Sequence, residues 1–275
     1  MTAGGTRRGA VLLAAVCSGS VLLPGCGGES APSSTPTPAE SGTFSSSSQE
    51  LGDGSVSTYV TLDEGGNPTE VGIRLTPTAL EGLPPSSTTL MIDMPDQAEA
   101  TAFDHVMLNW NPEGHEPPEL FGRPHFDFHF DMVDMATIES ITPDDPEFAV
   151  KAERLPETRY VPQDYAVAPG APVAAQAVPN MGVHLIDSSD TSLVPGQYDF
   201  TQIIINGVWD GRYTFIEPMI TRDWLLSGPS LEQPLKQPGA YQETGYYPTA
   251  YAVHVDQQTK DYVVALTGLT MRTAS

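Results

Sequence analysis

The chain has 275 residues, of which 39% are apolar and 17% are charged, so it is long and apolar enough to bury a core. Asp and Glu outnumber Lys and Arg by 35 to 12, and the formal net charge of −23 excludes nucleic acid and anionic lipid as electrostatic partners. The 25 Gly and 26 Pro residues favour turns and short strands over long helices, which predicts a mainly β protein.

The N-terminus has the pattern of a bacterial lipoprotein signal peptide, predicted over residues 1–25. Arg7 and Arg8 precede an apolar run at 10–16, and LPGC at 23–26 is similar to a lipobox, although Pro24 departs from the usual second residue. Cleavage before Cys26 would leave that residue lipidated and without a second cysteine for a disulfide. We therefore expect a protein anchored to the bacterial cell membrane through Cys26 and facing the extracytoplasmic side. The general and the twin-arginine export routes both stay open.

Residues 26–50 are predicted to be a disordered linker that carries the lipidated cysteine. Beyond Cys26 they are rich in Ser, Pro and Thr and contain almost no large apolar side chain, so they cannot repay the entropy of ordering. The folded domain is expected over residues 51–275.

The first part of this domain shows strand patterns separated by turn signals. Strands are predicted at 56–62 and 70–75, which flank the turn sequence GGNP, and at 88–94 and 104–110. Short helices are predicted at 134–141 and 146–154. The Pro- and Ala-rich segment 161–180 has little periodicity and is interpreted as a long surface loop.

The second part contains two predicted hairpins. Asp210-Gly211 joins strands at 203–209 and 212–217, and Thr221 can cap a short helix that ends at 226. A last hairpin is predicted from 251–256 and 261–269. Because no repeat or linker interrupts residues 51–275, we predict one β-barrel or β-sandwich domain with a few short helices.

Histidines are concentrated before and within one alternating segment. Four of the six fall between residues 105 and 129, and PHFDFHFD at 124–131 places three phenylalanines on one face of a strand. The aromatic face is expected in the core. The opposite face then carries imidazoles next to carboxylates, which is typical of a metal site or of a hydrogen-bonded polar network. The residues of this polar face are His125, Asp127, His129 and Asp131.

Strand geometry limits how these residues can share one ion. Positions i and i+4 of a straight strand are about 13 Å apart, too far for His125 and His129 to bind the same metal. Either the strand bends, or Asp127 mediates and only one of the two imidazoles is a ligand.

Two later residues fit the same interpretation. A two-residue turn at Asp210-Gly211 pairs Ile204 with Glu217, which places this carboxylate on a mainly apolar face where it needs a proton, an arginine or a metal. His184 shares a strand face with Gly182, whose missing side chain leaves space for a ligand, although a single strand histidine is also compatible with a core position.

We therefore predict that one divalent metal, Zn, Fe, Mn or Cu, lies inside the barrel. The predicted ligands are His115, His125, His129, His184 and Glu217. The predicted supporting residues around them are Asp127, His105 and Asp131.

Several motifs together resemble the TTHB-like domain family, a bacterial extracytoplasmic family of unknown function. The similarity covers roughly residues 54–265 and includes NPEGHEPP at 111–118, PHFDFHF at 124–130, MGVH at 181–184, EPMIT at 217–221 and GYYPT at 245–249. The resemblance implies a β-rich domain behind a lipoprotein signal, in which the five predicted ligands recur as the polar residues of the motifs. It implies no reaction. Family members carry tyrosine where this chain has Asp131.

Three functions follow from these features. The first is a membrane-tethered module that binds a metal or a small molecule, and the second is a metal-dependent enzyme of hydrolase, lyase or oxygenase type. The third is a structural or oligomerising envelope stress protein without catalysis. The sequence has no glycine-rich phosphate loop, GxSxG elbow, HExxH helix or EF-hand loop, so it assigns no catalytic residue.

Overall fold

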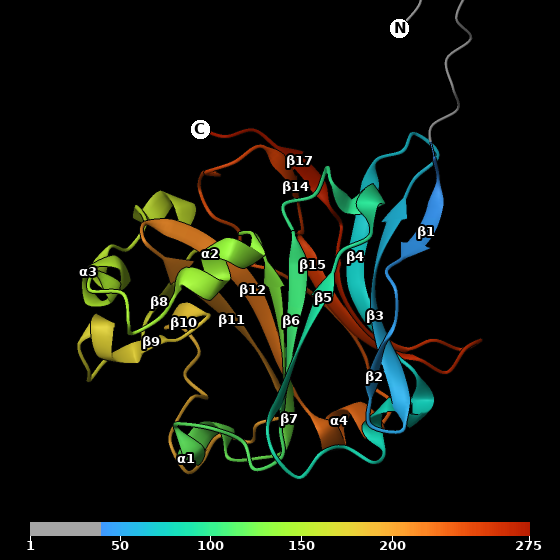
Figure 1. Ribbon diagram of the computed structural model, residues 1–275, viewed down its shortest axis with the longest axis horizontal. Helices are drawn as coiled ribbons and strands as arrows, with labels where there is room; N and C mark the ends of the chain where they lie inside the picture. The colour runs from blue at the N-terminus through green and yellow to red at the C-terminus, as the bar shows by residue number, and fades with distance from the viewer. Residues whose placement is uncertain (1–39) are drawn as a thin grey trace, which may run out of the picture. The chain divides into compact units, whose positions relative to one another are not determined.

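The computed structural model describes residues 40–275, which belong to one compact unit (Figure 1). The predicted signal peptide, Cys26 and the first part of the predicted linker lie outside the described residues. Within residues 40–275, no helix has the length and apolar character needed to span a membrane.

The first sheet has seven antiparallel strands. Its main path runs in the order β1 (Gly42–Ser45), β3 (Gly54–Leu62), β4 (Pro68–Leu75), β16 (Tyr262–Thr267), β15 (Ala250–Val255) and β13 (Ser230–Pro234), and β2 (Gln49–Leu51) pairs beside β1 on β3.

The second sheet has eight strands and holds the predicted site residues. Its main path runs in the order β5 (Thr88–Asp93), β6 (His105–Asn111), β7 (His125–Asp131), β12 (Arg212–Thr221), β11 (Gln202–Trp209), β10 (Gly182–Asp187) and β8 (Tyr165–Val167), with β9 (Ala177–Val178) also paired to β10. A separate small ribbon joins β14 (Gly245–Tyr247) and β17 (Thr270–Arg272).

The two sheets pack face to face around one apolar core, in a β-sandwich. Phe126, Phe128 and Phe130 of β7 lie in this core and are fully buried, together with residues of the first sheet such as Ile73 and Val264. The predicted aromatic face of this strand is therefore a core face. The mainly β fold is confirmed, but the sheets formed by residues 40–275 end in edge strands and do not close into a barrel.

The helices are few and short, as the high Gly and Pro content predicts. Asp134 caps the helix that follows it, since its side chain accepts a hydrogen bond from the Thr137 backbone N–H. Thr221 precedes the helix that begins at Arg222, as predicted, but its side chain does not cap that helix and its hydroxyl donates to the Thr201 carbonyl. The helices are α1 (Pro118–Phe121), α2 (Met135–Ser140), α3 (Phe148–Glu153) and α4 (Arg222–Leu226), with short 3₁₀ turns at Pro77–Leu80, Asp96–Ala98, Thr158–Tyr160 and Val173–Gln176.

The structure differs from the sequence expectation at the end of the linker and in the long loop. Strands β1 and β2, within or at the end of the segment expected to be disordered, pair with β3, and Leu51 is buried. Polar strands of this kind are stabilised by backbone pairing with a neighbour, which composition does not show. The predicted loop 161–180 likewise contains β8 and β9, both paired with β10.

The register of the β11–β12 hairpin also differs from the prediction. A β-bulge between Gly207 and Val208 shifts the pairing by one residue, so Glu217 lies opposite Ile205 rather than Ile204. An extra residue in one strand changes the cross-strand partner of every residue that follows, so Glu217 shares its face with Ile205 instead of Ile204.

Candidate metal centre

The polar face of β7 carries the candidate site. Because Phe126, Phe128 and Phe130 face the inter-sheet core, the alternate residues project from the other side of the eight-stranded sheet. Asp127, His129 and Asp131 are nevertheless buried, as is His125. The chain between β6 and β7, which includes α1, supplies His115 to this face.

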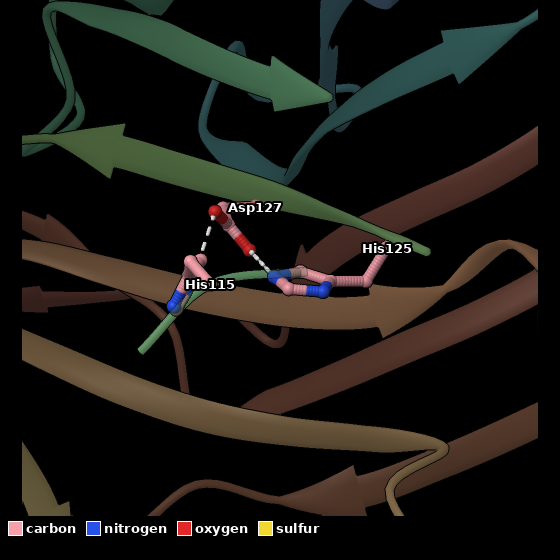
Figure 2. Close-up of side chains that lie close together, drawn as sticks. All are labelled: His115, His125 and Asp127. Atoms are coloured by element: carbon pink, nitrogen blue, oxygen red, sulfur yellow. Dashed lines mark ion pairs between the residues drawn. The ribbon is translucent and has the colours of Figure 1, made fainter. Parts of the chain in front are cut away.

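His115, His125 and Asp127 form the first cluster, called here the His115 group (Figure 2). The Nε2 atom of His125 lies 3.0 Å from Oδ1 of Asp127, and Nε2 of His115 lies 3.5 Å from Oδ2. Figure 2 shows the two imidazoles converging on this one carboxylate. Asn111 fixes the carboxylate by donating its side-chain amide to Oδ2 at 2.7 Å.

The outer nitrogens of the two imidazoles are held by backbone carbonyls. Nδ1 of His125 lies 2.7 Å from the Arg123 carbonyl oxygen, and Nδ1 of His115 lies 2.9 Å from that of Glu116. Since a carbonyl oxygen only accepts, each Nδ1 carries the proton and donates it. In the neutral ring, Nε2 then presents a lone pair to the carboxylate, the arrangement that metal-binding histidines adopt.

The residues of the second cluster, the His129 group, come from three strands. His129 of β7, His184 of β10 and Glu217 of β12 each offer one atom, and these atoms lie within 4.8 Å of one another. Nε2 of His129 lies 3.4 Å from Oε1 of Glu217, and Nε2 of His184 lies 3.6 Å from Oε2.

Packing around Gly207 orients the two imidazoles of the His129 group. A Cβ atom at Gly207 would lie 2.0 Å from the ring of Phe215, so only glycine leaves room for this ring. The Phe215 ring centroid is 4.8 Å from that of His129 and 5.2 Å from that of His184, with the rings in edge-on and inclined contacts. Phe215 therefore supports both imidazoles from one side.

Burial sets the protonation of the His129 group. Burial lowers the pKa of His129 to about 4 and that of His184 to about 3, so both imidazoles are neutral at pH 7. Burial also raises the pKa of Glu217 well above its ordinary value, and repulsion from the Asp127 carboxylate adds to the effect. The group thus supplies two neutral imidazoles and a carboxyl that ionises with difficulty unless a cation is present.

Protonation of the His115 group differs because His115 and the Asp127 carboxylate favour each other's charged forms. Burial works to lower the pKa of His115, but contacts with Asp127 outweigh it and raise the value. Burial works to raise the pKa of Asp127, yet His115 and His125 hold it well below its ordinary value. In this group a proton on His115 can therefore balance the carboxylate.

Each cluster combines two imidazoles with one carboxylate, and each could hold a metal ion. Ligand atoms about 2.1 Å from a tetrahedral ion lie about 3.4 Å from one another. The four nitrogen–oxygen distances in the two groups run from 3.0 to 3.6 Å, close to that spacing, and all the ligand atoms of each group lie within 4.8 Å of one another.

The five predicted ligands form two clusters, so the prediction of one shared ion inside a barrel is wrong. His125 and His129 lie at positions i and i+4 of a regular strand and join different groups. Asp127, expected to support the ligands, is itself a member of the His115 group.

His105 and Asp131 belong to neither cluster and face each other instead. Nε2 of His105 lies 3.3 Å from Oδ2 of Asp131, and its Nδ1 lies 2.9 Å from Oδ1 of Asp104. Both His105 and Asp131 are fully buried. Neither residue belongs to the candidate metal groups found within residues 40–275, and their supporting role around a metal stays a prediction.

Sequence reasoning did not identify Asn111, Gly207 or Phe215 as parts of the site. Asn111 lies opposite His125 in the β6–β7 register, and Gly207 lies opposite His184 in the β10–β11 register. Strand pairing brings Asn111 and Gly207 beside the cluster residues. The motif NPEGH, which begins at Asn111, is the sequence signal that points to Asn111.

No curated protein and no solved structure matches this chain. One family model does match, the TTHB210-like model described as hypothetical protein TTHB210, over residues 63–110. These residues run from the turn before β4 to Trp110, one residue before the end of β6, and include His105 but none of the six cluster residues. The match confirms that this part of the chain is similar to the TTHB210-like family.

Proposed function

We propose that the chain is a lipid-anchored extracytoplasmic protein whose β-sandwich binds divalent metal ions in the His115 and His129 groups. The observation that carries the proposal is the set of unpartnered buried atoms in the His129 group. Within residues 40–275, Nδ1 and Nε2 of His129 and Oε2 of Glu217 have no hydrogen-bond partner. Buried polar atoms without partners are costly, and a cation coordinated by Nε2 of His129 and by the Glu217 carboxylate would compensate this cost.

A purely structural hydrogen-bond network is less consistent with these contacts. Such a network needs a donor for every acceptor. Nε2 of His125 and Oδ1 of Asp127 lie 3.0 Å apart, yet neither atom has a hydrogen-bond partner within residues 40–275. A divalent ion is a partner for lone pairs on both sides at once.

The ligand type favours zinc or iron(II) among the divalent metals. Two histidines and one carboxylate are the protein ligands of catalytic zinc sites and of non-haem iron(II) oxygenases. Manganese and copper are weaker candidates, since manganese prefers more oxygen ligands and copper(II) prefers a tetragonal arrangement.

A metal-dependent enzyme is the second candidate function. Each group supplies three protein ligands, and a metal with three protein ligands keeps a coordination position for water or substrate. A bound metal would supply Lewis acidity there. The nearby cavity described below gives a substrate access to the ligands.

Metal analysis of the full chain tests the binding proposal. We expect about two zinc or iron ions per chain after loading and dialysis, and about one in His184→Ala. His254→Ala is the matched control, because His254 lies on β15 of the other sheet and belongs to neither group. Equal metal content in all three proteins, or no metal in the native chain, would contradict the proposal.

Cell fractionation tests the lipid anchor separately. Because Cys26 is the cysteine of the lipobox-like sequence, Cys26→Ala should move the protein from the membrane fraction to a soluble or unprocessed form. Cys17→Ala is the matched control and should leave the distribution unchanged. Membrane association of Cys26→Ala equal to that of the native chain would contradict the lipoprotein assignment.

A further inference from the structure

A single cavity of about 480 Å³ is lined by members of both clusters. His115 and Asp127 of the first group and all three residues of the His129 group contribute to its wall. The volume lies within the range of pockets that bind small organic molecules. A ligand in this cavity would therefore contact the ions of the proposed function directly.

Most of the remaining wall is apolar. Ile186, Ile205 and Met219 line the cavity beside the His129 group, and Phe121 and Met181 extend the apolar surface. Ile205 and Met219 also belong to a small buried cluster with Phe121, against which Ile186 packs. This wall is suited to an aliphatic group, not to a strongly hydrated one.

The charge balance of a loaded site calls for an anion. Two divalent ions bring four positive charges, and the carboxylates of Asp127, Glu217 and the lining residue Glu116 compensate three of them when the four histidines are neutral, which leaves one positive charge. The described lining residues include no lysine or arginine, so an anion entering the cavity has the ions as its cationic partners. An uncompensated charge beside an apolar wall is costly, which favours a ligand that carries negative charge.

The hydrogen-bond donors of the wall distinguish a carboxylate from a phosphate. Gln176 donates both amide hydrogens, to the carbonyls of Ala168 and Ala171, and Asn109 and Asn111 each donate one, to Thr89 and Asp127, so the side-chain amides that line the cavity keep two N–H groups. A phosphate has three or more oxygens that need donors. The two oxygens of a carboxylate can both be satisfied by metal coordination.

We propose that this cavity binds an aliphatic carboxylate, whose head group coordinates the metal of the His129 group and whose chain packs on Ile186, Ile205 and Met219. The proposal rests on the metal sites of the proposed function and adds the chemical class of their ligand.

Calorimetric titration of the zinc-loaded full chain with acetate, butanoate, hexanoate and octanoate tests this inference. Burial of each additional methylene should strengthen binding about fourfold until the cavity is filled. Hexan-1-ol, and hexanoate added to the metal-free chain, should bind at least about tenfold more weakly than hexanoate to the loaded chain, because the head group loses its metal contact. Inorganic phosphate should not displace hexanoate.

Two variants test whether the octanoate chain contacts the apolar wall of the cavity. Ile186→Ser should weaken octanoate binding about tenfold or more and leave acetate binding unchanged, because only the long chain reaches this side chain. Val194→Ser, a matched change of an exposed apolar residue outside the cavity, should alter neither.

The outcomes distinguish this proposal from the one it rests on. Four results would each overturn the carboxylate assignment while the metal sites stand. They are an affinity that does not depend on chain length, equal binding of hexan-1-ol, equally strong binding of hexanoate to the metal-free chain, and displacement of hexanoate by phosphate. A chain that takes up no metal would overturn both proposals.

Discussion

His129 and Glu217 face each other across two paired strands, with Nε2 of the imidazole 3.4 Å from Oε1 of the carboxylate, and both side chains are almost fully buried. Each residue alone would be a costly buried polar group. Together with His184 they form a three-ligand set in which a cation removes the cost of both.

Metal loading should stabilise the fold. A ligand that binds only the folded state adds about 4 kcal/mol to the free energy of unfolding when present at a thousand times its Kd. We expect chelation to lower the Tm of the native chain by several degrees, as measured by scanning calorimetry with and without zinc. Glu217→Gln should show a smaller difference between the two conditions, and a Tm of the native chain that does not depend on zinc would contradict the prediction.

Glu217→Gln should also change how the stability of the metal-free chain depends on pH. Because burial raises the pKa of Glu217 in the folded state, its contribution to stability is fully present below the unfolded pKa, near 4.3, and is lost as pH rises through the folded pKa. Glutamine does not ionise. We therefore expect Glu217→Gln to be more stable than the native chain at pH 8, by roughly 1–3 kcal/mol, and no more stable at pH 4. Urea denaturation at the two pH values measures this, and a difference that is the same at both would contradict it.

Two substitutions of Asp131 test how the His105–Asp131 pair is protonated. Burial raises the pKa of Asp131 well above its ordinary value, with Asp104 adding repulsion, so this carboxyl keeps a proton that it can share with His105. Asp131→Asn retains an N–H donor and should leave the free energy of unfolding at pH 7 unchanged or increased. Asp131→Ala leaves Nε2 of the buried His105 imidazole without a partner and should lower the free energy of unfolding by about 1–3 kcal/mol. Equal destabilisation by both substitutions in urea denaturation would show that Asp131 is ionised.

Deletion of residues 27–51 should destabilise the domain, contrary to what composition alone predicts. Gln49 donates its side-chain amide to the Met91 carbonyl, Ser46 accepts from the Thr58 backbone N–H, and Leu51 is buried. Loss of Leu51 burial alone should cost about 1.5–3 kcal/mol. The matched deletion of residues 27–39, which keeps β1 and β2, should leave the Tm within about two degrees. Equal Tm values for the two deletions would contradict the role of these strands.

The sequence by itself determined the local elements of the domain. Alternation in PHFDFHFD identified β7 and its buried aromatic face, and Asp210-Gly211 located the β11–β12 turn, because strand periodicity and turn chemistry depend on neighbouring residues. The same local reasoning selected His125, His129 and Glu217 as unusual polar residues on otherwise apolar elements.

Only the tertiary structure decided how these residues combine. The pairing of β7 with β12 and the position of β10 place His129 beside Glu217 and His184, while the α1 loop brings His115 to His125, so one expected site became two. The bulge at Gly207 changed the partner of Glu217, and pairing with β3 ordered β1 and β2 despite their polar composition. Register, bulges and pairing between distant strands depend on contacts across the whole sheet, and no short segment of the sequence contains them.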